Sequence, residues 1–520
     1  MTAIERIFAT ALTAVACLVS SKPVEAQLLP LAPAEGTHEP VCLALGSLEL
    51  PELAAIEAAW NRAVPAAVRD DALLPGEPLA LPAHCRVRGT VLPAIGFEVW
   101  LPAPEAWNGR FLAVGSGNGG SLSYERMRSA LAQGYATAST DTGHRAGDFS
   151  WLADDARLRD FGYRAVFEMT AKAAAIVPAF YARPADYRYF NGCSLGGRQG
   201  LMEAQRFPSD YDGIVAGAPA SVFVDAGSTE LWSARAARPA AGAGSLLGPD
   251  ELELVNDAAV AQCDTLDGVL DGVLEDPRRC SFDPARLQCG IAAGARCLTP
   301  VQVNAVRQIH AGPTDAETGL RLPGFALGSE PGWTFATSAE PSPLTLEFFR
   351  RAVFDDPFWA WQSFDFPEDH LYAEEETGWM LNAASTDLSR FRDHGGKLVL
   401  YHGWNDADVS PEATIAWYEA LEASLDGDTD PLEPRTRDFV RLFMVPGMSH
   451  CAGGIGTDQF DAQRALEDWV ERGLAPDRIE AERVESGEVT RTRPLCPYPE
   501  IARYRGSANS DRSGSFICAN

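Results

Sequence analysis

Short apolar segments alternate with longer amphipathic segments in the first half of the chain. A strand-like pattern of buried positions recurs at residues 96–102, 110–114 and 135–140. An alanine-rich amphipathic helix is expected at 161–181, and the short strand 187–190 leads into a glycine-rich turn and another helix. Strands that alternate with helices predict a mostly parallel sheet with helices on both faces.

The same alternation returns near the C-terminus, at residues 397–401 and 439–444. Between the two parts, a stretch with four clustered cysteines, an acidic loop and many aromatic residues breaks the rhythm. An insertion of this kind usually forms a lid at the carboxyl ends of the strands, and we expect most of its aromatic side chains to form its own core. The predicted organisation is a signal peptide at 1–26, the first part of the core at 27–220, a lid domain at 221–385 and the second part of the core at 386–520.

The first residues have the features of a cleavable export signal. Arg6 supplies a positive charge, residues 7–19 are apolar, and VEA at 24–26 resembles a cleavage site. The apolar run is too short for a permanent membrane span. Lipidation of Cys17 is the alternative, although the usual leucine is missing three residues earlier. We therefore expect a secreted or periplasmic protein.

Composition limits the partners further. The formal net charge of −29 argues against nucleic acid and against anionic membrane surfaces, and it suits calcium. Removal of the signal peptide takes Cys17 from the eleven cysteines and leaves ten, and an even number in an exported chain predicts five disulfides. The sequence has no C-x-x-C pair, which disfavours structural zinc and a thioredoxin-like site.

The strongest chemical signal is the sequence GCSLGG at residues 192–197, directly after a predicted strand and before a predicted helix. A G-x-S-x-G sequence in this context is the nucleophile elbow of an α/β-hydrolase fold. The turn is so tight that its flanking positions must be glycine, and it exposes the serine hydroxyl at the edge of the sheet. We therefore predict an α/β-hydrolase fold with Ser194 as the nucleophile.

A serine nucleophile needs a histidine base and a carboxylate that orients this base, in the chain order Ser, Asp, His. His450 and Asp406 each follow a predicted strand in the second part of the core, and they are the predicted base and acid. Asp408 is the nearest competitor for the role of the acid. His144 and His402 lack this placement, although His144 can line the site.

Acyl transfer also needs two backbone N–H donors that bind the oxyanion. Leu195, the residue after the nucleophile, is expected to supply one donor. The glycine-rich loop 115–120 is expected to supply the other, with Gly117 preferred. This loop is a poor match to phosphate-binding motifs, because it lacks the G-x-G-x-x-G spacing and the Walker lysine. No organic cofactor is expected.

A second candidate site is the sequence CDTLDGVLDGV at residues 263–273. Three aspartates at close, regular spacing, separated by glycine turns, can place oxygen ligands around a hard cation such as Ca²⁺. The loop resembles an EF-hand but lacks the glutamate at the twelfth position, so an EF-hand is rejected. Two Asp-Gly turns on an acidic surface are the alternative interpretation.

Together these segments resemble the tannase and feruloyl esterase family, which includes bacterial mono(2-hydroxyethyl) terephthalate hydrolases. The resemblance rests on the elbow, YHGWND at 401–406, GMSHC at 447–451 and the calcium loop, and it extends over nearly the whole mature chain. It implies a structural Ca²⁺ ion bound by the side chains of Asp264, Asp267 and Asp271 and by the carbonyls of Val269 and Val273. It also implies the disulfides Cys42–Cys85, Cys193–Cys451, Cys263–Cys280, Cys289–Cys297 and Cys496–Cys518.

The resemblance and the predicted triad imply a secreted serine carboxylesterase that acts on small esters of aromatic acids. Feruloyl and related hydroxycinnamoyl esters come first, galloyl esters second and terephthalate monoesters third. An acyltransferase or peptidase with the same triad is one alternative, and a catalytically silent, calcium-stabilised binding protein is another. The chain departs from many members after Asp406, where Ala407 and Asp408 replace proline and an aliphatic residue. The extra carboxylate leaves open which aspartate orients His450.

Overall fold

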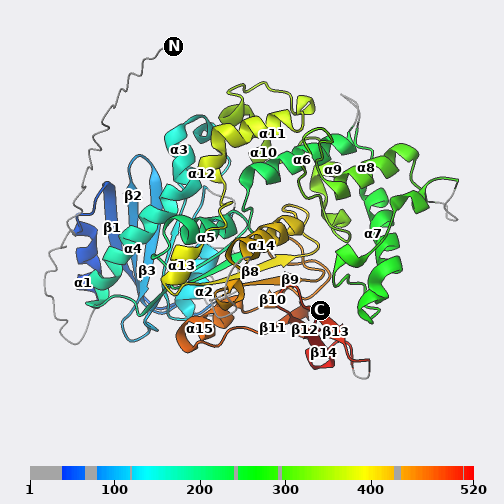
Figure 1. Ribbon diagram of the computed structural model, residues 1–520. Helices are drawn as coiled ribbons and strands as arrows, with labels where there is room; N and C mark the ends of the chain where they lie inside the picture. Colours follow the sequence, from blue (N-terminus) through cyan, green and yellow to red (C-terminus); the bar gives the residue numbers. More distant parts are fainter. Residues whose placement is uncertain are drawn as a thin grey trace, which may run out of the picture.

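The computed structural model in Figure 1 describes residues 38–64, 79–117, 120–238, 244–290, 296–426, 435–506 and 509–520. The predicted signal peptide, residues 1–26, lies outside these ranges. Within the described ranges, no helix is both long enough and apolar enough to cross a membrane.

Nine strands of the described chain form one central sheet, in the order β1-β2-β3-β5-β4-β6-β7-β8-β9. Strands β4 to β9 run parallel, whereas β1, β2 and β3 are antiparallel and extend one end of the sheet. The strands expected from the apolar pattern are confirmed, and the carboxyl ends of the parallel strands meet at one edge. The strands are β1 (Leu53–Asn61), β2 (His84–Val91), β3 (Ile95–Pro102), β4 (Arg110–Val114), β5 (Ala136–Thr140), β6 (Tyr187–Cys193), β7 (Gly213–Gly217), β8 (Lys397–Gly403) and β9 (Val440–Val445).

Helices cover both faces of this sheet, and strand β8 shows how the sequence directs side chains to each face. Leu398 and Leu400 belong to the core under α4, α5 and α14, whereas Val399 and Tyr401 belong to the core under α2 and α15. This period-two alternation of apolar side chains is the pattern of a strand that is buried on both faces. The covering helices are α2 (Tyr124–Ala132), α4 (Ala165–Tyr181), α5 (Leu195–Arg206), α14 (Pro411–Asp426) and α15 (Ala462–Arg472).

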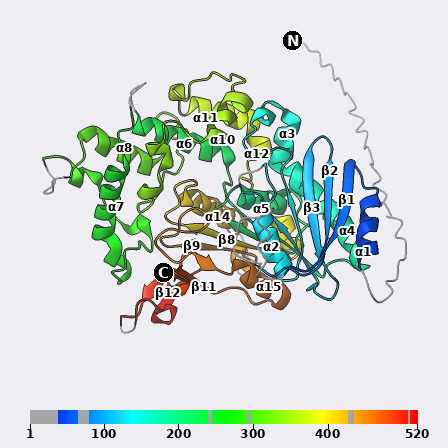
Figure 2. The same ribbon diagram turned by 180° about the vertical axis from the view of Figure 1, so that it is seen from behind.

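The segment between β7 and β8 carries helices and loops in its described part. In Figures 1 and 2, its helices α6 to α9 gather on the side of the molecule away from β1 and β2. The helices of this insertion are α6 (Phe223–Ala237), α7 (Pro249–Cys263), α8 (Pro300–Ala311), α9 (Thr334–Thr337), α10 (Pro343–Glu347), α11 (Glu368–Ala373) and α12 (Trp379–Leu381). Buried aromatic side chains such as Trp333, Phe348 and Phe364 form a separate core, as expected. This core continues into Leu195 and Val409, so the insertion packs directly against the edge of the sheet where the parallel strands end.

Arg198 joins the end of the insertion to helix α5 through hydrogen bonds. Its side chain is fully buried, and it donates hydrogen bonds to the carbonyls of Leu381 at 2.9 Å and of Gly162 and Phe161 at 3.0 Å. A buried charge without such partners would be strongly destabilising. The position of residue 381 relative to α5 is therefore tightly specified.

Helix α1 (Glu39–Ala44) lies beside β1, and helix α13 (Ser389–Asp393) lies beside α5. Leu158 of the short helix α3 (Asp155–Arg159) is buried in the same core as the aromatic side chains of the insertion. Near the C-terminus the described chain forms a three-stranded and a two-stranded sheet from β10 (Gln459–Phe460), β11 (Ile479–Glu485), β12 (Glu488–Leu495), β13 (Ile501–Tyr504) and β14 (Phe516–Ala519). Five disulfides join the pairs that the resemblance implies: Cys42–Cys85, Cys193–Cys451, Cys263–Cys280, Cys289–Cys297 and Cys496–Cys518.

Candidate active site

Ser194 lies at the sharp turn between strand β6 and helix α5. Its backbone has φ 64° and ψ −126°, a left-handed conformation that is rare for any residue other than glycine. A Cβ atom at Gly192 would lie 2.3 Å from the carbonyl oxygen of Gly196, and one at Gly197 would lie 2.4 Å from that of Gly217. Only glycine fits these positions, so the sequence around Ser194 holds a strained turn that presents the hydroxyl.

Asp406 is fully buried just after strand β8 and accepts four hydrogen bonds. Its Oδ1 accepts from the backbone N–H groups of Asp408 at 2.8 Å and Val409 at 2.9 Å. Its Oδ2 lies 2.7 Å from His450 Nδ1 and 3.0 Å from His402 Nε2. Asp406, rather than Asp408, therefore receives the hydrogen bond from His450.

Electrostatics at this cluster favour an ionised acid next to a basic imidazole. Burial alone would raise the pKa of Asp406, but the hydrogen bonds from His402 and His450 outweigh it and hold the pKa well below its usual range. Burial alone would lower the pKa of His450, but the hydrogen bond and charge of Asp406, with the charge of Asp408, raise it. Burial and the charge of Asp406 raise the pKa of Asp408, although the charge of His450 opposes them.

His402 is a site residue that the sequence analysis missed. Its Nε2 faces both Asp406 Oδ2 and the carbonyl of Val409, 3.1 Å away, and its Nδ1 lies 2.8 Å from Thr414 Oγ1. An Nε2–H tautomer that accepts from Thr414 satisfies all three contacts. His402 thus holds the carboxylate from the side opposite the solvent. In the sequence, His402 stands four residues before Asp406, at the end of a buried strand, and this spacing could have indicated its role.

His144 packs elsewhere. Its ring stacks on Trp151 at a centroid distance of 4.3 Å, and burial lowers its pKa to about 4. It is not among the described residues that line the cleft containing Ser194. His144 is therefore a neutral core residue beside the site.

Ser194, Leu195 and His450 line one cleft with a volume of about 290 Å³. Most of the wall comes from the insertion and is apolar. Two acidic residues, Glu230 and Asp408, also line it, and no lysine or arginine is found among the described lining residues. The aromatic rings of the wall are those of Phe223, Phe325, Phe335 and Phe348.

Of the two predicted oxyanion donors, Leu195 lies at the turn, and Gly117 lies in a loop whose first residue approaches it. Leu195 is the first residue of α5, where helical N–H groups have no partner within the helix. The neighbouring loop approaches this helix closely, because a Cβ atom at Gly115 would lie 2.8 Å from Gly196 Cα. The N–H of Ser116 donates to Gln199 Oε1 at 3.1 Å. Gly117 follows directly, while positions 118–119 of the loop lie outside the described residues.

The disulfide Cys193–Cys451 joins the residue before the serine to the residue after the histidine. Its Cα atoms lie 6.0 Å apart, although 258 positions separate the two cysteines in the sequence. The bond therefore fixes the nucleophile turn to the loop that carries His450. Such a connection would pre-organise the side chains of the predicted nucleophile and base.

The acidic loop 263–273 folds around its own backbone. Asp264 is buried, and its carboxylate accepts from the N–H groups of Asp271 at 3.2 Å and Gly272 at 3.0 Å. Asp271 Oδ2 lies 2.5 Å from Arg493 Nη2. Two groups of three side chains in the described chain bring their ligand atoms within 4.8 Å of one another, and the three loop aspartates are not one of them. Oxygen donors fit calcium here, and Asp271 would have to leave Arg493 to join them.

A serine at a strand–helix turn, together with a histidine hydrogen-bonded to a buried aspartate, is the arrangement expected at the active site of an α/β-hydrolase fold. The family model described as tannase and feruloyl esterase matches residues 81–519. The chain therefore belongs to the tannase and feruloyl esterase family and is a carboxylic ester hydrolase.

Individual relatives agree with this family. The chain is 37% identical to mono(2-hydroxyethyl) terephthalate hydrolase of Piscinibacter sakaiensis, over 89% of this chain and 88% of that protein. It is 31% identical to probable feruloyl esterase B-1 of Aspergillus oryzae, over 84% of each. The crystal structure of feruloyl esterase B from Aspergillus oryzae superposes with a TM-score of 0.82 at 28% identity, covering 93% of this chain and all (100%) of that one.

Proposed function

We propose that this protein is an exported serine esterase that hydrolyses esters of aromatic acids through an acyl-enzyme. The observation that carries the proposal is the His450–Asp406 hydrogen bond of 2.7 Å at a cleft that His450 shares with Ser194. The low pKa of Asp406 and the raised pKa of His450 suit a base that must take a proton from serine.

The reaction follows from these roles. His450 Nε2 accepts the proton of Ser194 as the serine oxygen attacks the ester carbonyl, and Asp406 holds the tautomer that leaves Nε2 free. The N–H groups of Leu195 and Gly117 stabilise the tetrahedral oxyanion. The protonated His450 then gives its proton to the leaving alcohol, and water releases the acid from the acyl-enzyme by the same steps.

The cleft wall supports an aromatic acyl group without a negative charge. Phenyl rings of the insertion, such as Phe223 and Phe348, supply flat apolar surface. Asp408 offers an acceptor for a phenolic hydroxyl group, whereas both oxygens of Glu230 already accept hydrogen bonds from Ser342 and Thr345. The free carboxylate of a terephthalate monoester would meet two carboxyl groups and, apart from the catalytic base His450, no lysine or arginine among the described lining residues, so its desolvation would be poorly compensated. Hydroxycinnamoyl esters are therefore the first choice, galloyl esters the second and terephthalate monoesters the third.

A panel of three esters tests this order. Methyl ferulate should give the highest kcat/KM, methyl gallate the next and a terephthalate monoester the lowest. Glu230→Gln should narrow the gap between ferulate and the terephthalate monoester, because one carboxyl group leaves the cleft. Preferred turnover of the terephthalate monoester by the unchanged protein would refute the substrate assignment.

Three other functions are separated when an acceptor alcohol and an amide substrate are added to these assays. An acyltransferase would transfer the acyl group to an added alcohol in preference to water, and a peptidase would cleave the matching amide. A silent binding protein would turn over none of the esters. The complete set of hydrogen bonds to Asp406 favours an active enzyme over the silent binding protein.

Three further proposals concern the surroundings of the site. The insertion acts as a lid, because it supplies most of the cleft wall. The loop 263–273 binds a structural Ca²⁺ ion through the side chains of Asp264, Asp267 and Asp271 and the carbonyls of Val269 and Val273. Export is supported by the sequence of residues 1–26 and by five disulfides, which persist in oxidising compartments.

A further inference from the structure

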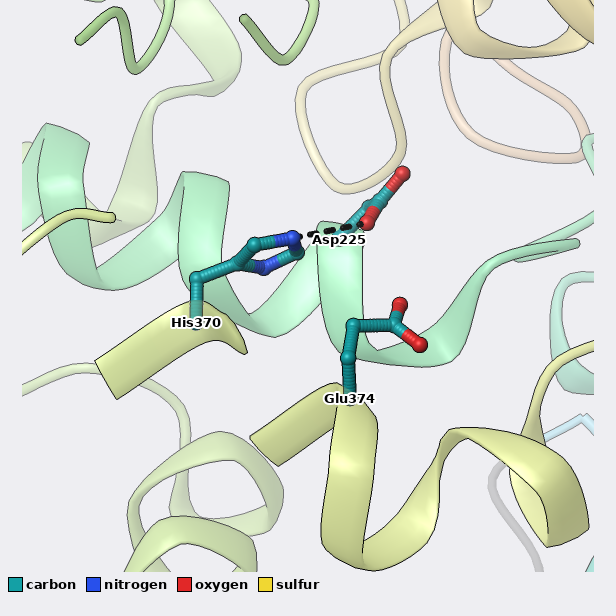
Figure 3. Close-up of side chains that lie close together, drawn as sticks. All are labelled: Asp225, His370 and Glu374. Carbon is teal, nitrogen blue, oxygen red and sulfur yellow. Dashed lines mark ion pairs between the residues drawn. The ribbon is translucent and has the colours of Figure 1, made fainter. Parts of the chain in front are cut away.

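Asp225, His370 and Glu374 form a second group of histidine and carboxylates, outside the catalytic site. Asp225 lies in the first turn of α6, His370 lies on α11, and Glu374 follows four residues later at the start of a π-helical turn, Glu374–Gly378. Figure 3 shows the three side chains close together at the junction of these helices. One ligand atom from each lies within 4.8 Å of the others.

The imidazole of His370 is oriented toward the two carboxylates. Its side chain is 4% exposed, and its Nδ1 lies 3.1 Å from Ser228 Oγ. Its Nε2 lies 3.7 Å from Asp225 Oδ1, which is too far for a hydrogen bond. When Nδ1–H donates to Ser228, the lone pair of Nε2 points into the group without a partner.

The two carboxylates are arranged as ligands rather than as members of ion pairs. Glu374 is held by Asn382 Nδ2, at 2.8 and 2.9 Å from its two oxygens, and Asn382 Oδ1 accepts from the N–H of Val224 at 3.3 Å. Asp225 accepts no hydrogen bond from the described residues, and its one ion-pair contact is the distant His370. Two partly buried carboxylates without a lysine or arginine partner are costly unless a cation joins them.

We propose that Asp225, His370 and Glu374 bind a divalent transition-metal ion, with Zn²⁺ as the best match. One imidazole nitrogen and two carboxylate oxygens suit Zn²⁺ or Mn²⁺, whereas Ca²⁺ prefers oxygen ligands alone. Three protein ligands leave a fourth position of a tetrahedral zinc site to water. The site is distinct from the acidic loop 263–273, and it does not depend on the proposed esterase mechanism.

The position of Asp225, His370 and Glu374 beside the cleft would give a bound ion a structural role there. Helix α6 carries Asp225 toward the group, while Phe223 and Gly227 of the same helix line the cleft with Ser194. His370 and Glu374 come from the last part of the insertion. A bound ion would therefore join the beginning of the insertion to its end and hold α6 against the cleft.

Zinc binding by the full mature protein tests the site. The protein is freed of metal, reloaded with excess Ca²⁺ and titrated with Zn²⁺, and Co²⁺ is used in parallel because its visible spectrum reports the ligand geometry. One Zn²⁺ ion should bind, and Asp225→Asn and Glu374→Gln should each weaken it at least tenfold. Asn382→Ala, which frees Glu374 from its partner, should weaken binding by about 10–100-fold.

Two controls make the result specific. Glu375→Gln changes the exposed neighbour of Glu374 on the same turn and should leave zinc affinity unchanged. Asp406, Asp408 and His450, at the proposed esterase site, form the other group of three with ligand atoms within 4.8 Å, so His450→Ala must retain the zinc ion. Melting curves of the isosteric variants check that they fold. Absence of zinc binding, zinc binding unaffected by Asp225→Asn and Glu374→Gln, or zinc lost in His450→Ala would each overturn the proposal.

Discussion

Two groups of side chains place a histidine beside carboxylates, and the described part of the protein supplies a full set of hydrogen-bond donors to Asp406 in one group but none to Asp225 in the other. At the catalytic edge, every lone-pair direction of Asp406 is used by backbone N–H groups or by imidazoles. In the insertion, Asp225 accepts no hydrogen bond from the described chain. The pKa of Asp406 is held well below its usual range, whereas burial and then the charge of Glu374 raise the pKa of Asp225 to about 7.

The difference shows how the same residue types are directed to different chemistry. A carboxylate with a full set of donors stays ionised and fixes the tautomer of its histidine, which suits proton transfer. A carboxylate without donors is stabilised by a proton or by a metal ion. Hydrogen bonding of the carboxylate, more than the presence of histidine, thus separates the catalytic group from the proposed zinc group.

Separate replacement of Asp406 and of Asp225 should test the difference between the two groups most clearly. Asp406→Asn should lower kcat by about 10⁴, because an amide cannot hold the required tautomer of His450, with little change in KM. The loss in kcat from Asp225→Asn should be smaller by at least about 100-fold. Steady-state kinetics on the best ester provide the measurement. Similar losses from the two variants would remove the distinction between the groups.

Removal of the Cys193–Cys451 disulfide should affect catalysis and stability together. The double change to alanine should lower kcat by about 100-fold, because the serine turn and the histidine loop lose their covalent connection. It should also reduce the free energy of unfolding by about 2–5 kcal/mol, since the bond closes a long loop. The matched control is the double change of Cys289 and Cys297, which close a loop far from the serine. A kcat loss in the control as large as in the test variant would show that the disulfide effect is not local to the triad.

Calcium removal should reduce the stability of the protein without a separate effect on the triad residues. Chelation should lower Tm, with a loss of about 2.7 kcal/mol if the free ion was present at 100 times its Kd. Asp267→Asn should abolish the recovery of Tm on addition of Ca²⁺, and Glu375→Gln should preserve it. A Tm that does not respond to chelator, with no calcium in an elemental analysis, would contradict the calcium site.

Asp408→Asn should produce the smallest effect, on the pH profile. The charge of Asp408 raises the pKa of His450, so its removal lowers that pKa. Catalysis needs neutral His450, and the acidic limb of kcat/KM should therefore move to lower pH by less than about one unit. A movement to higher pH, or a kcat loss as large as that of Asp406→Asn, would contradict the role given to Asp408.

The local parts of the catalytic site could be predicted from the sequence. The elbow around Ser194 combines a strand pattern, two glycine positions and a helix pattern within a few residues, and both Asp406 and His450 follow apolar strands. Parallel strands bring their carboxyl ends together, so chain order alone places these residues at one edge. The pairing of cysteines came from family resemblance, since spacing alone leaves many connectivities open.

Other features depend on contacts that local patterns do not encode. Strand β1 (Leu53–Asn61) has the sequence LAAIEAAWN, whose alanines, leucine and glutamate favour a helix. It forms a strand because it pairs with β2 along its whole length. Asp225 and His370 are distant in sequence, and only the four-residue spacing of His370 and Glu374 hinted at a shared site.

Covalent trapping of the nucleophile tests the proposed mechanism most directly. The protein is treated with a fluorophosphonate, which phosphonylates an activated serine with loss of fluoride, and the adduct is located by mass spectrometry of the digested protein. We expect one adduct per chain, on the peptide with Ser194, and loss of esterase activity in proportion to labelling. Ser194→Ala should fold, take no label and lose about 10⁶ in kcat. An adduct on another serine, or esterase activity that survives in Ser194→Ala, would contradict the assignment.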